Sequence, residues 1–442
     1  MEGCSSSASA SASSETEPRG EATARSSIAS SGTCAPDTAA RRVAVVGASL
    51  GGLAVANVFQ QLAGFEVDVF ERSASTMENK GSGLGFVDVN AWQQLRMTRM
   101  IRRGQQAHRS QGAFYYGDLW QYLYDGLPGG AVRFGRTIES LGDDPTRRPT
   151  IDGTVYDLVV LADGGWSALR PHVTSTQPYY TGYVVWRGLV DAAAVPRYNT
   201  FGVFKAGIYD TIVMPLAGDG LGRDFIVCGV FIATPEVEAR PPVPGTARHT
   251  GSLPPSVPSW FLPFFRLQFG GQANGELVRL FEAVAASGKL SAHPQYDYAA
   301  DSVHAGRLLL VGDAAHMASP RTAVGAHTAI LDALALRQAL EGDADAASGS
   351  AEVIDEALRR YAPGGVQRAA QLLQRAHSRQ QRHIRSVSFC VSLCLSVPLC
   401  ASLCLFVKCR FPGAGSQEVG RQFVPAGGVA EVVSPQLLLN PA

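Results

Sequence analysis

The chain has 442 residues, 46% of them hydrophobic, and its 38 Lys and Arg residues balance its 38 Asp and Glu residues. At roughly 150 residues per domain, a chain of this length can form more than one hydrophobic core. The zero formal net charge gives no sign of a basic surface, so we expect no nucleic-acid partner. The eight cysteines contain no Cys-x-x-Cys pair, which predicts no metal site and favours a reducing compartment such as the cytoplasm.

Residues 1–40 are rich in Ser and Ala and lack the apolar run of a secretory signal. The alternative of a transit peptide is disfavoured by five acidic residues: Glu2, Glu15, Glu17, Glu21 and Asp37. We therefore predict a disordered leader over 1–40.

A β-α-β unit follows the leader. Val43–Val46 reads as a short buried strand, 47–52 (GASLGG) as a tight turn and Leu53–Leu62 as a helix. A second strand over Phe65–Phe70 ends in Glu71. The unit is the usual context for binding of a dinucleotide.

The turn itself departs from the dinucleotide fingerprint Gly-x-Gly-x-x-Gly, because its three key positions are Gly47, Ser49 and Gly52. The acidic residue expected about 20 residues later, which binds ribose hydroxyls, is present as Glu71. A plain β-α-β crossover is the alternative; the turn and Glu71 together favour adenine dinucleotide binding.

A second candidate site lies at the end of an apolar strand over Asp157–Ala162, where Asp163 and Gly164 follow. Open α/β sheets bind ligands at the carboxyl ends of their strands. Asp-Gly is also a common turn pair, but Ser167 and Arg170 at the following positions favour a binding motif.

The segment Arg307–Ile330 carries the third candidate site. Leu308–Val311 reads as a buried strand that ends in a Gly-Asp pair, and a helix begins near Gly325 after a loop that contains proline. The Asp313 carboxylate can bind hydroxyls, and the helix N-terminus favours an anionic ligand. An ordinary strand–loop–helix connection is the alternative.

Short strands without helical periodicity fill residues 183–232 and predict an antiparallel sheet. Helical patterns return over Gly275–Ser287, Ala323–Leu340 and Ala351–Gln381, the last with a break expected at Pro363. The predicted domains are a leader (1–40), a cofactor domain (41–178 and 300–380), a β-rich substrate domain (179–299) and a low-complexity hydrophobic tail (381–442). Within the tail, Ser386–Val407 has no charge, so it predicts either a membrane span or low-complexity sequence.

The order of GASLGG with Glu71, then ADGGWSALR (162–170), then GDAAH (312–316) resembles the FAD-dependent aromatic hydroxylases of the para-hydroxybenzoate hydroxylase fold. The resemblance covers Arg42 to Arg379. Within the family, TGYVVWRGLVD (181–191) is most similar to the 2,6-dihydroxypyridine 3-hydroxylase branch. The implied fold class is α/β: a Rossmann-like FAD-binding domain, an antiparallel β-sheet substrate domain and C-terminal helices.

The resemblance also implies roles for individual residues. Pro320 would lie beside the flavin ring at the substrate and is the one catalytic position. The cofactor-binding residues would be Gly47, Ser49, Leu50, Gly51 and Gly52 at the diphosphate, Glu71 and Arg72 at the adenosine ribose, Asp163 and Gly164 near the diphosphate, Asp313 at the ribityl chain, and Gly325 and Ala326 at the flavin pyrimidine. No catalytic base is assigned. Two positions depart from the family pattern, because Ala323 replaces a Gly and His327 replaces an Asn.

The implied activity is hydroxylation of a phenolic or N-heteroaromatic small molecule by an FAD-dependent, NAD(P)H-using monooxygenase through a flavin C4a-hydroperoxide. The small aromatic substrate and O2 are the expected partners, and a homodimer is compatible with the pattern. The alternatives are a catalytically silent FAD-binding protein, suggested by Ala323 and His327, and an FAD-dependent epoxidase or reductase of the same fold. Membrane association would depend on the 386–407 segment.

Overall fold

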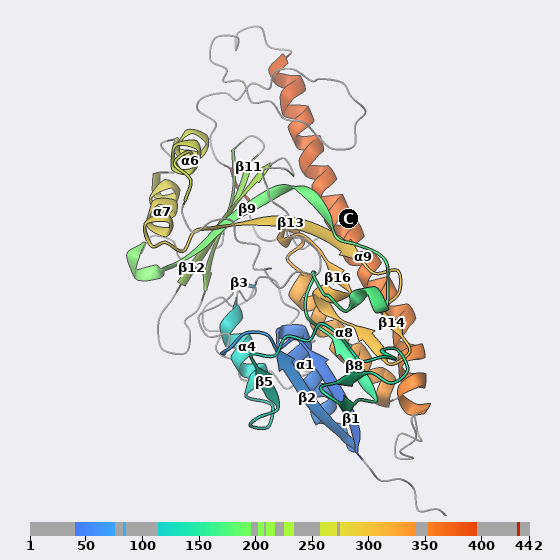
Figure 1. The fold of residues 1–442 in the computed structure, drawn as a ribbon. Helices are drawn as coiled ribbons and strands as arrows, with labels where there is room; N and C mark the ends of the chain where they lie inside the picture. The colour runs from blue at the N-terminus through green and yellow to red at the C-terminus, as the bar shows by residue number, and fades with distance from the viewer. Residues whose placement is uncertain are drawn as a thin grey trace, which may run out of the picture. The chain divides into compact units, whose positions relative to one another are not determined.

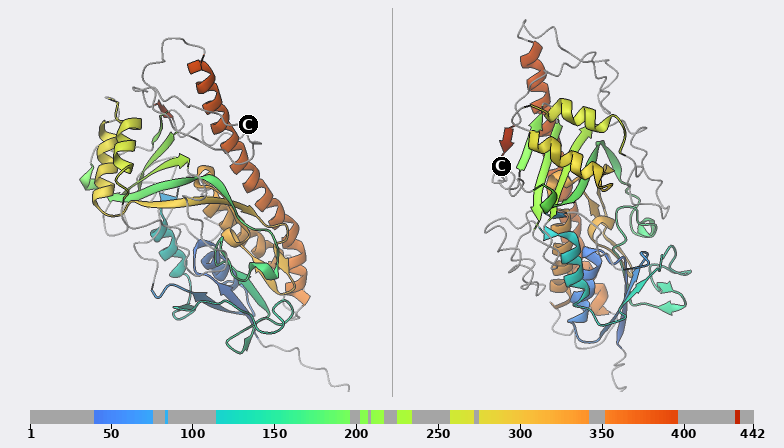
Figure 2. Two further views of the ribbon diagram at one scale, coloured as in Figure 1. Left: turned by 45° about the horizontal axis from the view of Figure 1, so that its top comes forward. Right: turned by 90° about the vertical axis from the view of Figure 1, so that its left-hand side faces the viewer.

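The computed structural model describes residues 40–75, 83–84, 114–195, 202–206, 209–216, 225–233, 257–271, 275–341, 352–395 and 431–433. The leader up to residue 39 and the tail after Leu395, apart from 431–433, lie outside the described residues. Figure 1 shows the fold, and Figure 2 gives two further views of it.

The first of two large sheets has six strands in the order β14-β15-β8-β1-β2-β5. Their bounds are β14 (His304–Ala305), β15 (Leu308–Leu310), β8 (Leu158–Leu161), β1 (Arg41–Val46), β2 (Phe65–Glu71) and β5 (Val132–Phe134). All pairs are parallel except β14 with β15. Strands β8 and β15, and β1 from Val43 onward, are continuous apolar runs that are buried, as expected for a parallel sheet covered on both faces.

Four helices accompany this sheet: α1 (Leu50–Gln60), α4 (Tyr116–Tyr124), α8 (Gly325–Glu341) and α9 (Glu352–Leu395). Helix α1 is buried from Leu50 to Phe59 because it packs between α4 and α8, and α8 in turn contacts α9 (Figure 1). One continuous core joins these helices to the sheet. The N-terminus of α1 is thereby fixed at the carboxyl end of β1.

The second sheet has seven strands in the order β16-β13-β9-β12-β11-β10-β17 and is antiparallel throughout. Their bounds are β16 (His316–Met317), β13 (Ser291–Ala299), β9 (Tyr179–Asp191), β12 (Phe225–Ala233), β11 (Tyr209–Leu216), β10 (Gly202–Ala206) and β17 (Glu431–Val433). Helices α6 (Phe261–Phe269) and α7 (Gly275–Ala286) cover one face with a core rich in phenylalanine (Figure 2).

The remaining elements are small. Strand β3 (Gly83–Leu84) pairs with β4 (Phe114–Tyr115), and β6 (Thr150–Ile151) pairs with β7 (Thr154–Val155). Short 3-10 turns occur at η1 (Arg170–His172), η2 (Ala192–Ala194), η4 (Gly312–Ala314) and η5 (Pro320–Thr322).

The predicted fold class is confirmed, with a parallel sheet, an antiparallel sheet and C-terminal helices. The division into a cofactor and a substrate domain at the stated boundaries stays a prediction. Within the second sheet the sequence did not identify β13, which pairs with β9 along most of its length.

The expected helix break at Pro363 is wrong, because α9 continues through it. Its buried face, which includes Leu358, Tyr361 and Ala369, stays in register on both sides of the proline. Gly365 also allows the backbone of α9 to approach Val303 closely, because a Cβ at this position would lie 2.9 Å from a methyl carbon of Val303. Tertiary packing therefore outweighs the local penalty of the proline.

The hydrophobic segment 386–407 falls only partly within the structure, since α9 ends at Leu395. In the part of the chain that the structure describes, no helix meets the length and apolarity needed for a membrane span.

Candidate active site

The turn between β1 and α1 depends on two glycines. Gly47 has φ +104°, and a Cβ there would lie 2.4 Å from the carbonyl oxygen of Ala162. A Cβ on Gly52 would lie 1.9 Å from the carbonyl oxygen of Gly47. Both positions therefore require glycine, and the turn passes closely over the end of β8.

Ser49 is the N-cap residue of α1, but its side chain makes no capping hydrogen bond. Its Oγ lies 2.8 Å from the hydroxyl oxygen of Tyr116 on α4. Sequence reasoning missed Tyr116, because this partner position is 67 residues away and belongs to no motif.

Glu71 lies at the carboxyl end of β2 and is only 4% exposed. Its carboxylate accepts hydrogen bonds from the backbone N–H groups of Ala48 and Ser73, each at 2.8 Å. A carboxylate has about four acceptor sites, so about two remain for further hydrogen bonds. The neighbouring Arg72 is exposed, and its charge acts on Asp163.

Asp163 follows β8 at the edge where β1 and β2 also end. Burial raises its pKa to about 6, although Ser167, Arg170 and Arg72 oppose the shift. Its Oδ1 is buried and has no hydrogen-bond partner among the described residues. Gly164 has φ +93° with open space beside it. An unpartnered carboxylate oxygen at a strand end fits a site that is completed by a bound ligand.

Ser167 and Arg170 support the strand end from behind. Arg170 is 2% exposed, donates to the carbonyl oxygen of Gly165 at 2.7 Å and lies 4.5 Å from the ring centre of Tyr298. The Ser167 hydroxyl accepts the Arg170 N–H at 3.0 Å. These two residues hold the shape of the Asp163 loop.

Asp313 lies in η4, directly after β15, and its side chain is exposed. The backbone beside it is held by Asp332 of α8, which accepts the Gly312 N–H at 3.0 Å. The same carboxylate bonds Nε2 of His316 at 2.7 Å and Nε of Arg368 at 2.9 Å. His316 and Asp332 are each only 1% exposed, so His316 belongs to the support of the loop.

The loop before α8 carries Pro320 on its surface, at the start of η5. It contacts the second sheet, because the hydroxyl of Tyr183 bonds the hydroxyl of Ser319. Arg321 pairs with Asp210 of β11 and lies 4.3 Å from the ring centre of Phe231. The loop is thus anchored to the sheet face that α6 and α7 leave uncovered.

Gly325 and Ala326 form the first turn of α8, where backbone N–H groups have no intrahelical acceptor. Just before it, Ala323 has φ +57°, which is the left-handed conformation. The alanine therefore takes up the backbone geometry that a glycine would adopt more easily.

We expect Ala323→Gly to stabilise the protein by about 0.5–1 kcal/mol, because the strain of a left-handed alanine exceeds the entropic cost of glycine. The free energy of unfolding from denaturant titration measures the change. Ala335→Gly, in the middle of α8, is the control and should destabilise by about 1 kcal/mol. Equal losses in both variants would contradict the assigned conformation.

Arg187 lies on β9, on the same strand face as Tyr183 and Val185. Among the described residues, no carboxylate is shown paired with it. Its register partner on β13 is Ser291, which bonds His293 at 2.8 Å. Burial, with a contribution from Arg187, lowers the pKa of His293 to about 3, so this imidazole is neutral.

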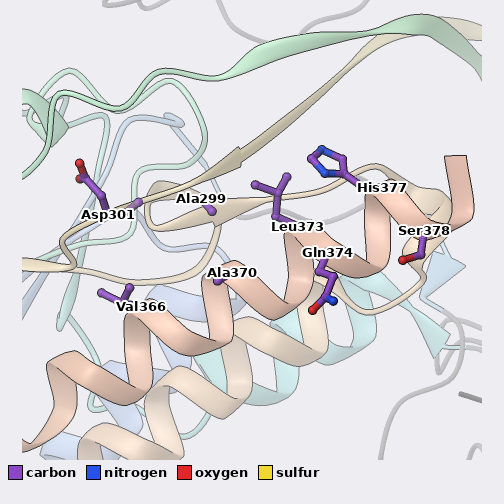
Figure 3. A pocket seen from close by; sticks show the side chains of 9 residues that line it. Ala299, Asp301, Val366, Ala370, Leu373, Gln374, His377 and Ser378 are labelled. Carbon is purple, nitrogen blue, oxygen red and sulfur yellow. The ribbon is translucent and has the colours of Figure 1, made fainter. Parts of the chain in front are cut away.

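A groove of about 520 Å³ lies between the end of β13 and α9 (Figure 3). It is lined by Ala299, Ala300, Asp301, Val366, Ala370, Leu373, Gln374, His377 and Ser378. None of the predicted site residues lines this groove. The His377 ring is bonded to the Tyr179 hydroxyl.

The residues predicted from sequence thus come together at one edge of the parallel sheet. Gly47, Glu71, Asp163 and Asp313 all lie at the carboxyl ends of β1, β2, β8 and β15. In Figure 1 these strand ends point toward the second sheet. The turn, the carboxylates and the helix N-termini at this edge, which we call the cradle, offer groups that can bind an anionic, hydroxyl-bearing ligand.

Comparison with known proteins agrees with this geometry. Residues 276–376 match the family model described as an FAD binding domain. The 3-amino-4-hydroxybenzoate 2-monooxygenase of Streptomyces platensis is 29% identical over 380 residues, which cover 76% of this chain and 87% of that protein. The 2,6-dihydroxypyridine 3-monooxygenase of Paenarthrobacter nicotinovorans is 28% identical and covers 67% of this chain and 82% of its own.

Solved structures share the fold. The 2,6-dihydroxypyridine-3-hydroxylase of Arthrobacter nicotinovorans aligns with a TM-score of 0.61 at 22% identity, over 79% of this chain and 93% of that one. Klebsiella pneumoniae HpxO, solved with FAD and uric acid, aligns with a TM-score of 0.59 at 21% identity, over 79% and 91%. Together, the three ordered motifs, the match to an FAD-binding domain model and the relatives that align along most of its length show that the chain is similar to FAD-dependent aromatic hydroxylases.

Proposed function

We propose that the protein is an FAD-dependent, NAD(P)H-using monooxygenase that hydroxylates a phenolic or N-heteroaromatic small molecule. The observation that carries the proposal is the junction between the cofactor cradle and the second sheet. There the Pro320 loop bonds Tyr183 and Asp210 of the sheet through Ser319 and Arg321. Relatives named for the hydroxylation of hydroxybenzoate, hydroxynicotinate and dihydroxypyridine support the substrate class.

In this proposal the predicted residues keep their roles. The FAD diphosphate would be held by Gly47, Ser49, Leu50, Gly51 and Gly52, with Asp163 and Gly164 near it. The adenosine ribose would be bound by Glu71 and Arg72, and the ribityl chain by Asp313. Gly325 and Ala326 would face the flavin pyrimidine, and Pro320 would lie at the substrate. The fit rests on the glycine-only turn and on the unpartnered Oδ1 of Asp163.

Bound FAD supplies the redox chemistry with NAD(P)H and O2. The chain contributes binding and electrostatics. The N-termini of α1 and α8 direct backbone N–H groups at negative charge without reorganisation. The buried side chains of Tyr183, Val185 and Phe231 pack together beside the Pro320 loop and would limit the access of water there.

The purified protein should be yellow, and aromatic ring compounds should stimulate its oxidation of NADPH or NADH. We expect at least about tenfold stimulation by an accepted substrate, because positioning and exclusion of water act only when the pocket is filled. Panels of phenols and hydroxypyridines, each with and without a ring carboxylate, would be screened by NAD(P)H absorbance and product mass.

Each outcome of this screen has a distinct meaning. Loss of all flavin on purification would contradict the proposal. Retained FAD without stimulation by any aromatic compound would favour a silent FAD-binding protein. Stimulation with an alkene but no aromatic would favour an epoxidase. A homodimer and a cytoplasmic location stay predictions, which size-exclusion chromatography and localisation of the tagged chain would test.

A further inference from the structure

The departure from the dinucleotide fingerprint at Ser49 has a structural counterpart on α4. Serine at an N-cap normally turns its hydroxyl onto the N–H groups of the first helical turn. Here φ −83° and ψ −177° place Ser49 in the extended N-cap conformation, yet no such bond forms. Its Oγ lies instead 2.8 Å from the hydroxyl of Tyr116.

The consequence is that two N–H donors in the first turn of α1 stay open, while the Leu50 N–H bonds the Tyr116 hydroxyl. The Gly51 and Gly52 N–H groups have no acceptor among the described residues. A self-capping Ser49 would occupy one of these donors and compete with a bound phosphate. The hydrogen bond to Tyr116 removes that competition, because it holds the Ser49 hydroxyl away from these two donors.

Tyr116 is itself rigidly placed. Its helix α4 packs on α1 (Figure 1), and Trp120 donates its indole N–H to the Ala48 carbonyl oxygen at 2.6 Å. One turn further, the Asn57 side chain donates to the Leu123 carbonyl oxygen at 2.8 Å. The hydroxyl therefore reaches Ser49 from a fixed base.

Two carboxylates of the candidate site act on Tyr116. Burial raises the pKa of Tyr116 to about 12, with Asp313 and Glu71 contributing and hydrogen bonds from Ser49 and the Leu50 N–H opposing the shift. The phenol thus stays protonated at neutral pH, and the carboxylates that act on it are those assigned to the ribityl chain and the adenosine ribose. The diphosphate of FAD joins these two parts of the cofactor.

We propose that Tyr116 is a positioning residue for FAD: it holds the Ser49 hydroxyl off the first turn of α1, so that this turn and that hydroxyl can bind the diphosphate. The pair compensates for the missing second glycine of the fingerprint. The inference rests on FAD binding by the proposed enzyme, and it assigns no step in the reaction.

The test is a cycle of variants in which the affinity of the apoprotein for FAD is measured by quenching of flavin fluorescence. Tyr116→Phe should weaken binding about tenfold, because the freed Ser49 hydroxyl then caps its own helix. In a Ser49→Ala background, where no hydroxyl can compete, Tyr116→Phe should cost less than about twofold. Ser49→Ala alone should weaken binding about fivefold, through loss of one hydroxyl donor.

Tyr124→Phe is the matched control, because it removes a hydroxyl from the same helix while leaving its ring free to stack on Trp120. It should leave the affinity unchanged, and thermal unfolding would show that all variants fold. Equal penalties for Tyr116→Phe in the wild type and in the Ser49→Ala background would overturn the proposal, as would wild-type affinity in Tyr116→Phe. Wild-type protein that fails to bind FAD at all would contradict the proposed function instead.

Discussion

Replacing Gly52 with alanine should abolish FAD binding. The added Cβ would lie 1.9 Å from the Gly47 carbonyl oxygen and 3.2 Å from the Ala162 Cβ, so the turn and the start of α1 must separate. Overpacking against backbone costs about 3 kcal/mol at the upper end of the usual range, which corresponds to about a hundredfold or greater loss of affinity. The loss of affinity is measured by the flavin content after purification and by titration of the apoprotein with FAD.

Gly129→Ala provides the control for this prediction, because no atom lies within 4 Å of the position that its added methyl group would take, and the site is exposed. Its affinity for FAD should match the wild type. An FAD affinity in Gly52→Ala within about threefold of the wild type would show that the turn does not approach the diphosphate as assigned.

Replacing Asp332 with alanine should destabilise the protein by about 3–5 kcal/mol, because it leaves buried His316 and half-buried Arg368 without their counter-ion. It also releases the Gly312 N–H, so the loop that carries Asp313 loses its support. The free energy of unfolding from denaturant titration measures the loss. The control variant Glu341→Ala removes an exposed ion pair of the same helix. It should change the free energy of unfolding by less than about 0.5 kcal/mol.

The stabilisation by this buried pair should depend on pH in a defined direction. Burial alone lowers the pKa of His316, but Asp332 outweighs it and the net shift is upward. Burial alone raises the pKa of Asp332, whereas His316 and Arg368 outweigh it and the net shift is downward.

When folding raises the pKa of a histidine, that histidine stabilises the folded state at pH below its unfolded pKa of about 6.5. This stabilisation is lost as the pH rises through the folded pKa. When folding lowers the pKa of an aspartate, that aspartate stabilises the folded state at pH above its unfolded pKa of about 3.9. This stabilisation is lost as the pH falls through the folded pKa. The difference between wild type and Asp332→Ala should therefore be largest between about pH 4 and 6.5. A difference that does not change with pH would contradict an ionised His316–Asp332 pair.

Sequence reasoning could expect the candidate site residues to meet at one sheet edge because the motifs that carry them are local. A strand that ends in glycine or a carboxylate can be recognised within about ten residues, and parallel strands bring their carboxyl ends to one edge. The bounds of β1, α1 and β2 agree with the expected ones to within three residues or so at each end.

The contacts that support the cradle could not be found in this way. Tyr116 with Ser49 and Asp332 with Gly312 join residues 67 and 20 positions apart, and each depends on how one helix packs on another. The continuation of α9 through Pro363 has the same origin, since a buried face on both sides outweighs a local signal. These long-range contacts and the course of α9 are determined by tertiary packing, which a single sequence does not reveal.

The most direct test of the central claim is the incorporation of heavy-isotope dioxygen into an aromatic product. FAD-loaded protein would be supplied with NAD(P)H and the best stimulating aromatic compound, and the product analysed by mass spectrometry. The account predicts a product that carries one labelled oxygen atom on the ring, with NAD(P)H consumed in proportion. Unlabelled product, or peroxide as the sole product while the ring compound is recovered unchanged, would contradict the assignment as an aromatic hydroxylase.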